Sequence, residues 1–360
     1  MTRFIALYTD DFLANLTGAY CERKLLSMER VVVFGSDGYV GAVLSMQLQE
    51  SQIQFVGLDS KWFSPSPDDR EGIATDVRDF DLQELGFTPS AIVYLSAVSN
   101  DPIGESFSVP TLEINAHAAE RIAVQAKSLG VSRFIVASSC SVYGDSGKDA
   151  RSETDRTMPL TTYAKSKVLL EDSLRPLADS SFRVIALRFA TACGPSPSQR
   201  LDVVLNDLVA SALSSGVIGL NSDGQSWRPL IDVRDMARAI IWALTCAPSG
   251  MSPFEVINVG SEQSTLRVID LANEVASAFP GVEIHVRNQA TVDARSYTVD
   301  FAKFRNLAPA HQPRISVQQS ISDLREYLDS ESFFAPAPRR LEHLLGLIHA
   351  RELDENLRWL

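Results

Sequence analysis

The sequence predicts an α/β fold, in which a doubly wound parallel sheet is followed by a smaller α+β lobe. Two observations support this prediction. From Arg30 onward, short apolar runs alternate with segments of helical periodicity, which is typical of a parallel sheet covered by helices. A glycine-rich turn at residues 35–41 joins the first apolar run to the first helical segment. The length of 360 residues exceeds that of one typical core and agrees with two parts.

The strands of the sheet are predicted by runs of β-branched and other apolar residues. Between these runs, apolar residues recur at helical spacing, as Val40, Val43 and Leu44 do after the first run. This alternation predicts the doubly wound arrangement. The expected strands are residues 31–34, 53–58, 91–95, 133–137 and 182–187.

After Gly194 this alternation ends in a stretch rich in proline and serine. Shorter strands and helices then continue to about Leu328 without the same rhythm. We therefore expect four regions, which are an N-terminal extension (1–27), the sheet domain (28–194), a smaller lobe with some elements interleaved with the sheet domain (195–330) and a helical tail (331–360).

Both ends of the chain leave alternatives open. Met28 lies just before the first strand, so residues 1–27 either precede the real start or form an extra helix that covers a sheet edge. In the tail, an apolar stripe at helical spacing packs either on its own domain or in a subunit interface. The stripe consists of Leu341, Leu344, Leu345 and Ile348.

The charge and cysteine content exclude several classes of protein. With 33 basic and 45 acidic side chains the net charge is −12, and such a field repels nucleic acid. An anionic ligand therefore needs a local arginine cluster or a helix N-terminus. The cysteines and histidines show no metal-binding spacing, and no apolar run is long enough to span a bilayer. We expect a cytoplasmic protein without a metal, a disulfide framework, or a membrane or nucleic-acid partner.

The turn after the first expected strand has the spacing of a dinucleotide site. Gly35 allows the tight turn, Gly38 lets a pyrophosphate approach the backbone, and Gly41 lets the helix pack on the strand. Asp59, at the end of the second strand, is either a solvated turn residue or a ligand of the adenosine ribose. As a ligand it would repel a 2′-phosphate, which favours NAD over NADP. The other expected cofactor contacts are Asp37, Tyr39, Val40, Asp76, Val77, Leu95 and Ala97.

Tyr163 and Lys167 lie four residues apart near the start of a predicted helix and share one face of it. A lysine cation beside a phenol favours the phenolate, which makes tyrosine a useful acid or base at neutral pH. Ser139 follows the strand at 133–137 and can hydrogen-bond the reacting oxygen. A tyrosine and a lysine at this spacing also occur by chance on amphipathic helices. The order of glycine turn, acid, serine run and Tyr/Lys pair favours hydride chemistry.

These motifs together resemble a known family. In order along the chain they are the glycine turn, Asp59, Asp76, the serine run 138–144 and the segment 163–167. They resemble the extended short-chain dehydrogenase/reductases, and in particular the NAD-dependent epimerase/dehydratase group that acts on nucleotide sugars. The resemblance extends over residues 30–328 and implies an NAD-binding Rossmann domain followed by a substrate-binding lobe.

The resemblance also implies roles for single residues. Tyr163 would be the acid/base, and Lys167 would hold the nicotinamide ribose and lower the pKa of the phenol. Ser139 would orient the substrate hydroxyl or ketone. Asn115 matches the asparagine of the family's central helix, and it is either a direct cofactor contact or a buried amide satisfied by the protein.

Two arginines resemble the family's ligands for the nucleotide diphosphate, namely Arg228 in the segment 227–235 and Arg295 in the segment 293–297. Guanidinium groups suit a diphosphate because they offer forked donors and a permanent charge. Each arginine could equally form a surface salt bridge. The further expected substrate contacts are Ser99, Asn100, Ser141, Thr191, Arg200 and Asn206.

Ser141 is the most informative departure from the family pattern. Sugar 4,6-dehydratases and nucleotide-sugar decarboxylases usually carry a glutamate at this position, and water elimination without that carboxylate lacks its usual acid/base partner. Cys140 stands one residue before the cysteine of the 3,5-epimerising reductases. A small structural thiol is the simpler interpretation of Cys140.

The resemblance leads us to expect a nucleotide-diphosphate-sugar epimerase of the C4 type. A transient keto-sugar would form while hydride shuttles through tightly bound NAD. An NAD(P)H-dependent 4-ketosugar reductase would use the same residues. A sugar dehydratase, a decarboxylase or a catalytically silent NAD-binding protein is less favoured. We expect a homodimer whose small-molecule partner is a nucleotide sugar.

Overall fold

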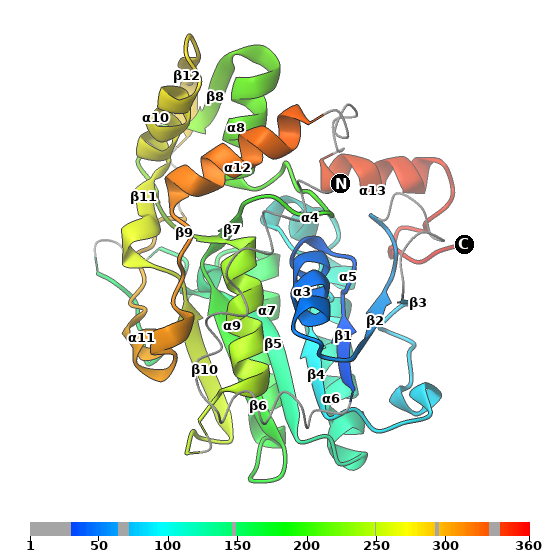
Figure 1. Cartoon of the computed structure of the whole chain (residues 1–360). Coiled ribbons are helices and arrows are strands. Elements are labelled where there is room, and N and C mark those ends of the chain that lie inside the picture. The colour runs from blue at the N-terminus through cyan, green and yellow to red at the C-terminus, as the bar shows by residue number, and fades with distance from the viewer. Residues whose placement is uncertain (1–29, 64–71, 146–148, 249, 292–294, 331–338) are drawn as a thin grey trace.

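The computed structural model describes residues 30–63, 72–145, 149–248, 250–291, 295–330 and 339–360. A seven-stranded parallel sheet carries helices on both faces, and a smaller lobe sits at the carboxyl ends of its strands (Figure 1). The predicted doubly wound α/β fold is confirmed. The alternatives weighed for residues 1–27 lie outside the described part of the chain.

The main sheet has the strand order β10-β6-β5-β4-β1-β2-β3, and all neighbouring strands are parallel. Strands β2 and β3 lie on one side of β1, and the next strand along the chain, β4, lies on the other side of β1. Open α/β sheets bind ligands at the point where the strand order reverses in this way. The strands are β1 (Val31–Phe34), β2 (Phe55–Asp59), β3 (Ile73–Ala74), β4 (Ala91–Tyr94), β5 (Arg133–Ser139), β6 (Arg183–Phe189) and β10 (Phe254–Val259).

Helices bury both faces of this sheet. Because side chains alternate along a strand, Val31 and Val33 enter the core on one face, while Val32 and Phe34 enter the core on the other. Strands buried on both sides are apolar throughout, which is why they could be recognised in the sequence. The helices of this domain are α3 (Tyr39–Glu50), α4 (Asp101–Ser106), α5 (Ser108–Leu112), α6 (Ala118–Ser128), α7 (Thr162–Leu174), α9 (Val233–Thr245) and α11 (Ala302–Leu307).

The smaller lobe contains a three-stranded and a two-stranded sheet packed against helices. Its core includes Leu205, Leu271 and Leu324. The chain passes between the two parts more than once. After lobe strands, α9 packs against the main sheet and β10 joins it. The lobe elements are β7 (Thr191–Cys193), α8 (Val204–Ser215), β8 (Val217–Ser222), β9 (Trp227–Asp232), β11 (Thr265–Arg267), α10 (Val268–Ala278), β12 (Glu283–Thr291) and α12 (Val317–Asp329).

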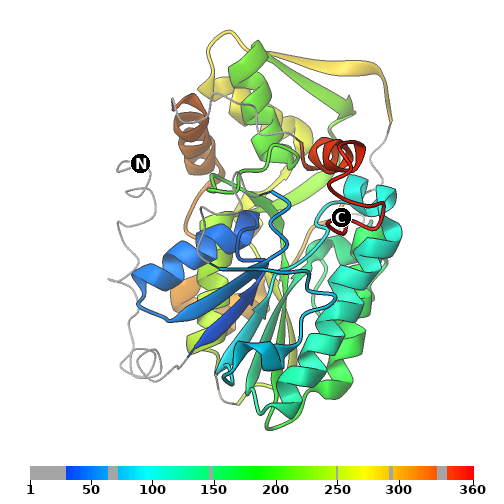
Figure 2. The same cartoon turned by 90° about the vertical axis from the view of Figure 1, so that its right-hand side faces the viewer.

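The tail contains helix α13 (Arg340–His349), drawn in red beside the carboxyl ends of the sheet strands (Figures 1 and 2). Leu344 is buried in the core of the sheet domain, and Leu341 and Ile348 pack against it. Leu345 is exposed. The apolar stripe therefore packs on its own domain, which is one of the two alternatives expected from the sequence.

Cys140 and Cys193 are free and buried. In the described residues, no helix is long and apolar enough to cross a membrane. Those residues also contain no group of three or more potential metal ligands.

Candidate active site

A cavity of about 740 Å³ lies at the carboxyl ends of the sheet strands and is lined by both the sheet domain and the lobe. The predicted site residues line it, with the exceptions of Asn115 and Asn206. Those lining it are Gly35, Asp37, Gly38, Tyr39, Val40, Gly41, Asp59, Asp76, Val77, Leu95, Ala97, Ser99, Asn100, Ser139, Ser141, Tyr163, Lys167, Thr191, Arg200, Arg228 and Arg295.

Two glycines of the turn lie where the surrounding backbone leaves no room for a side chain, as their spacing predicted. Gly35 has a φ of +80°, and a Cβ there would lie 2.7 Å from Ser96 N. A Cβ on Gly41 would lie 1.9 Å from Gly35 O. Gly38 is the N-cap of α3 and has no side chain to cap the helix. The turn therefore presents bare backbone and a helix N-terminus to the cavity, which fits a pyrophosphate group.

Asp59 links the end of β2 to the glycine turn. Its Oδ2 accepts a hydrogen bond from Asp37 N at 3.0 Å, and its Oδ1 accepts one from Lys61 N at 2.8 Å. Burial raises the pKa of Asp59. The ammonium of Lys61 in turn pairs with the Asp37 carboxylate. The carboxylate predicted for the ribose is thus fixed in place by the backbone of both loops.

Asp76 lies beyond the short strand β3. Arg78 Nε donates to its Oδ1 at 2.9 Å. Burial alone would raise the pKa of Asp76, but the hydrogen bonds and the charge of Arg78 outweigh it and hold the pKa below its usual value. The carboxylate predicted near the adenine therefore stays ionised.

Tyr163, Lys167 and Ser139 come together from two neighbouring elements. Ser139 ends β5, and Tyr163 and Lys167 lie on successive turns of α7. Lys167 Nζ donates to Ala137 O at 2.7 Å and lies 5.6 Å from the centre of the Tyr163 ring. Ser139 Oγ accepts hydrogen bonds from Ser141 N at 3.2 Å and Ser141 Oγ at 2.9 Å. The arrangement places a phenol, a hydroxyl and an ammonium at the same side of the cavity.

The pKa values in this trio correct one expectation. Withdrawal from water and the Asp101 carboxylate raise the pKa of Tyr163 to about 12, although Arg200 and a hydrogen bond with Ser139 act in the opposite direction. Burial lowers the pKa of Lys167 to about 8, although Glu171 opposes this shift. Lys167 was expected to make the phenol more acidic, but in the protein alone the cost of a buried phenolate is larger.

A buried network that the sequence did not reveal supports α7. Ser138 Oγ donates to Glu171 Oε1 at 2.6 Å, and Arg188 Nε donates to the same oxygen at 2.8 Å. Arg188 Nη1 also donates to the Tyr143 hydroxyl at 2.8 Å. Because Glu171 lies one turn after Lys167, the network fixes the helix turn that carries the lysine against β5 and β6.

Asn115 supports the site without lining the cavity. It lies in a π-helical turn (Glu113–His117), where its Nδ2 donates to Val98 O at 3.0 Å and to Ser166 Oγ at 2.9 Å. Its Oδ1 accepts from Val98 N at 2.8 Å. These contacts match the buried amide satisfied by the protein, which is one of the two alternatives that the sequence left open for Asn115.

Asn206 also lies outside the lining of the cavity. It is fully buried in α8, where its Oδ1 accepts from Gly194 N at 3.1 Å. Its Nδ2 donates to Tyr39 Oη at 3.1 Å and Arg200 O at 2.9 Å. The amide therefore holds the Gly194 loop against the start of α3.

Three arginines that were predicted for the substrate line the cavity. Arg228 donates to Trp227 O at 2.9 Å, and its guanidinium lies 5.7 Å from the centre of the Tyr297 ring. Arg295 pairs with Asp101 at 2.5 Å. Arg200 donates to Asp202 at 2.8 Å. All three guanidinium groups line the cavity, and two of them are paired with a carboxylate.

The sequence analysis missed several residues that line the cavity. Phe63 and Arg340 are examples, since they border it from the loop after β2 and from α13. The tail was expected to pack only through its apolar stripe. Two adjacent arginines at the start of that helix were a signal in the sequence, but nothing local placed them beside the site.

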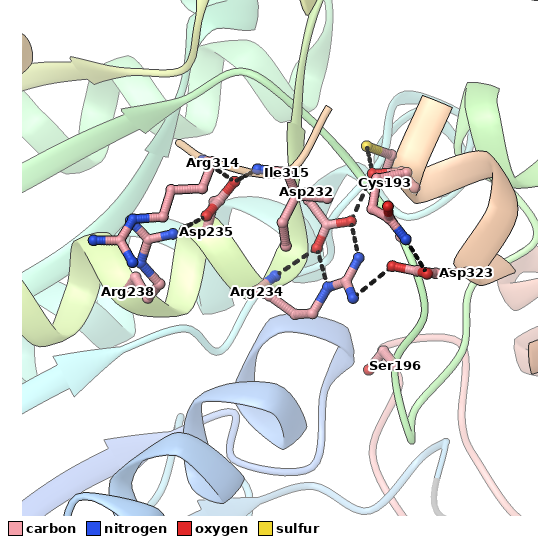
Figure 3. Close-up of polar contacts among 12 residues, drawn as sticks. Cys193, Ser196, Asp232, Arg234, Asp235, Arg238, Arg314, Ile315 and Asp323 are labelled. Carbon is pink, nitrogen blue, oxygen red and sulfur yellow. Dashed lines mark hydrogen bonds and ion pairs between the residues drawn. The ribbon is translucent and has the colours of Figure 1, made fainter. Parts of the chain in front are cut away.

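A polar network fastens the lobe to the sheet domain beside this cavity (Figure 3). Asp232 caps α9 through Arg234 N at 3.0 Å and also accepts from Arg234 Nε at 2.8 Å. Arg234 Nη1 lies 2.8 Å from Asp323 on α12, and Ser320 Oγ donates to Asp232 at 2.7 Å. The segment that carries Arg228 therefore continues into the buried joint between the two parts.

Comparisons with known proteins identify the family of this chain. The chain matches the model of the NAD dependent epimerase/dehydratase family over residues 31–260. The dTDP-L-rhamnose 4-epimerase of Burkholderia thailandensis is 24% identical over 86% of this chain and 97% of its own. The structure of MoeE5 in complex with UDP-glucuronic acid and NAD has a TM-score of 0.73 at 25% identity, over 83% of this chain and 98% of that chain. TunA, an NAD dependent-NDP-hexosamine 5,6-dehydratase, also has a TM-score of 0.73, at 21% identity over 84% of this chain and 99% of that chain.

Proposed function

Because the chain belongs to the NAD dependent epimerase/dehydratase family, we propose that it is a nucleotide-diphosphate-sugar epimerase of the C4 type. It is an enzyme of an NAD-dependent family, and the sugar hydroxyl would be oxidised to a ketone and then reduced from the opposite face. The observation that carries the proposal is one cavity lined by both the Tyr163, Lys167 and Ser139 trio and three arginines. The similarity to a dTDP-L-rhamnose 4-epimerase supports carbon 4 as the site of inversion.

The residues of the sheet domain fit NAD. The tight packing at Gly35 and Gly41 and the N-terminus of α3 leave backbone donors for the pyrophosphate. Asp59 and Lys167 would hold the two riboses. When bound, NAD supplies a reversible acceptor for the hydrogen on the sugar carbon and a positive charge beside the phenol.

The protein's own part in the reaction is proton transfer and orientation. Tyr163 takes the proton of the substrate hydroxyl and later returns it, while Ser139 hydrogen-bonds the same oxygen. With a phenol pKa of about 12, Tyr163 is almost entirely protonated at neutral pH in the protein alone, so little phenolate is present to act as the base. Positive charge at this end of the cavity, which includes Lys167 and Arg200, favours the phenolate.

Ser141 favours epimerisation over dehydration. The serine takes the position where water-eliminating relatives carry a carboxylate, and its Oγ donates to Ser139 Oγ at 2.9 Å. The two serine hydroxyls would donate hydrogen bonds to the substrate. Neither of them can replace a carboxylic acid that protonates a leaving hydroxyl. The 4-ketosugar reductase remains the second candidate, since it would use the same trio.

A direct test is to incubate the purified protein with a panel of nucleotide sugars without any added cofactor. We expect one sugar to be converted to its epimer of identical mass. Tyr163→Phe should lower the rate at least about 100-fold, because general acid–base catalysis contributes about 10²- to 10⁴-fold. The variant should keep its bound NAD, since the phenol is not needed for the phosphate contacts.

Other products would decide against the epimerase. Consumption of one NAD(P)H for each product would identify the reductase, and a mass loss of one water would identify a dehydratase. Full activity in Tyr163→Phe would contradict the role of the phenol. We also expect a homodimer and a cytoplasmic location, which light scattering and cell fractionation would test.

A further inference from the structure

The C-terminal segment 340–360 is an integral part of the sheet domain. Leu344 on α13 is 1% exposed, and Leu353 and Leu357 beyond the helix are buried in the same core. Burying three leucine side chains stabilises this arrangement, because their apolar surface is removed from water. The segment is therefore packed against the sheet domain.

Hydrogen bonds fasten this segment to the loop that follows Asp59. His343 Nε2 lies 2.7 Å from Trp62 O, and Trp359 Nε1 donates to Ser60 O at 2.7 Å. Ser60 and Trp62 both line the cavity. The segment therefore lies over the loop next to the carboxylate predicted to hold the adenosine ribose.

Arg78 fastens the far end of the segment near the predicted adenine position. Its Nη1 donates to Asn356 O at 2.7 Å and its Nη2 donates to Leu357 O at 3.0 Å. The same guanidinium pairs with Asp76, which lines the cavity. Together with the previous contacts, these bonds place the segment along the adenosine end of the dinucleotide site. We call residues 340–360 the C-terminal strap.

The strap brings a buried cation to the cavity. Arg340 is 7% exposed and lines the cavity, and its guanidinium lies 4.2 Å from the centre of the Phe63 ring. Its Nη2 has long hydrogen bonds to Ser198 O at 3.4 Å and Ser198 Oγ at 3.3 Å. Among the described residues, no carboxylate forms an ion pair with this guanidinium.

Burying the charged guanidinium of Arg340 costs free energy unless a bound anion compensates its charge. Burial and the nearby Arg200 lower the pKa of Arg340 to about 9, while the charges of Asp202 and Asp59 and the Tyr39 phenol act in the opposite direction. Arg340 lines the same cavity as Asp59, at the predicted ribose position, and Tyr39, beside the glycine turn. A phosphate oxygen is a strong partner for a buried guanidinium, because a charge-assisted hydrogen bond compensates the charge.

We propose that Arg340 binds a phosphate group of NAD and that the C-terminal strap presents it at the adenosine end of the dinucleotide site. The contacts of the strap adjoin Asp59, whereas two of the three arginines assigned to the sugar nucleotide, Arg228 and Arg295, contact Tyr297 and Asp101. For this reason we assign the phosphate to NAD, and separate binding of NAD and UDP tests this assignment. The inference rests on NAD as the cofactor of the proposed function but does not depend on epimerisation.

The test compares Arg340→Gln with Arg351→Gln in the full chain after removal of bound NAD. Arg351 is an exposed strap arginine that does not line the cavity, so its variant makes the same charge change away from the site. Calorimetry would give the affinity for NAD and, separately, for UDP. Arg340→Gln should weaken NAD binding at least about tenfold, because hydrogen bonds to charged groups contribute about 1.5–3 kcal/mol. Binding of UDP should stay within twofold, and Arg351→Gln should change neither affinity.

Thermal unfolding without ligand separates this role from a structural one. The Arg340 guanidinium has no carboxylate partner among the described residues. The unfolding temperature of Arg340→Gln should therefore lie no more than about 2 °C below that of the unaltered protein. An unchanged NAD affinity would overturn the proposal, as would an equal loss of UDP affinity or a loss of NAD affinity that accompanies unfolding. A protein that shows the expected NAD effect but does not epimerise would refute the proposed function alone.

Discussion

Lys167 occupies a position that favours function at the expense of stability. Its ammonium is buried, and its pKa is lowered to about 8 from the 10.5 of an exposed lysine. At neutral pH that shift corresponds to a cost of about 3 kcal/mol, because each unit of pKa is worth about 1.4 kcal/mol. A charge held at such a cost inside a cavity is a candidate for binding or catalysis.

Replacing this lysine should therefore remove activity without unfolding the protein. Lys167→Met keeps the length of the side chain and removes the buried charge, so we expect kcat to fall at least about 100-fold while the free energy of unfolding stays equal or rises. Steady-state kinetics and urea denaturation would measure the two effects. Lys165→Met, an exposed neighbour on the same helix, should change neither. A stability loss in Lys167→Met as large as the activity loss would instead assign Lys167 a structural role.

At this scale the sequence predicted which residues lie near the cavity better than it predicted what they contact. Glycine positions and the Tyr163/Lys167 pair follow from local spacing, which a sequence displays directly. Asn115 and Asn206 lie outside the lining of the cavity, and spacing does not show whether an amide lines a cavity or the core. The high pKa of the phenol depends on burial, which local spacing does not show either.

Among the elements, α9 carries the joint between the two parts of the chain. Asp235 in its first turn accepts hydrogen bonds from Arg314 N at 2.9 Å and Ile315 N at 3.0 Å, just before α12 (Figure 3). Burial raises the pKa of Asp235 to about 6 despite the neighbouring Arg238. The folded protein therefore binds a proton at this carboxyl more readily than the unfolded chain does.

This shift predicts that Asp235 makes the protein more stable as the pH falls. Between the unfolded pKa near 3.8 and the folded pKa of about 6, the folded state holds more protons, so acidification through this window adds stability. From pH 8 to pH 5 the gain should be about 1 kcal/mol relative to Asp235→Asn, which has no carboxyl to titrate. Urea unfolding of both proteins at the two pH values would measure it. His311, whose pKa burial lowers to about 4, contributes in both proteins and cancels in the comparison. An equal pH dependence in the two would contradict the assignment.

The elements were predicted where they are locally continuous. The runs at 31–34 and 133–137 became β1 and most of β5 because strands buried on both faces are apolar throughout. The place of β10 beside β6 was not predictable, since it depends on pairing across a long stretch of chain. For the same reason the apolar stripe of α13 indicated packing but not that Arg340 would reach the cavity.

At the scale of the whole molecule, the position of the cavity explains the function we propose. The sheet domain contributes the glycine turn and the trio, and the lobe contributes Arg228, so a molecule held between them would touch both. The family predicted from the order of motifs is confirmed by the match over residues 31–260. The sequence indicated this family because most of its motifs lie in the sheet domain and are continuous in sequence.

The fate of the hydrogen on the inverted carbon tests the central claim most directly. A nucleotide sugar carrying deuterium at carbon 4 is incubated with the purified protein and without added cofactor, and the product is analysed by mass spectrometry and NMR. If one bound NAD takes up and returns the same hydrogen, the epimer should keep its deuterium at carbon 4, and unlabelled NADH in the solution should not dilute it. Loss of the label to water or to NADH in the solution would contradict the account.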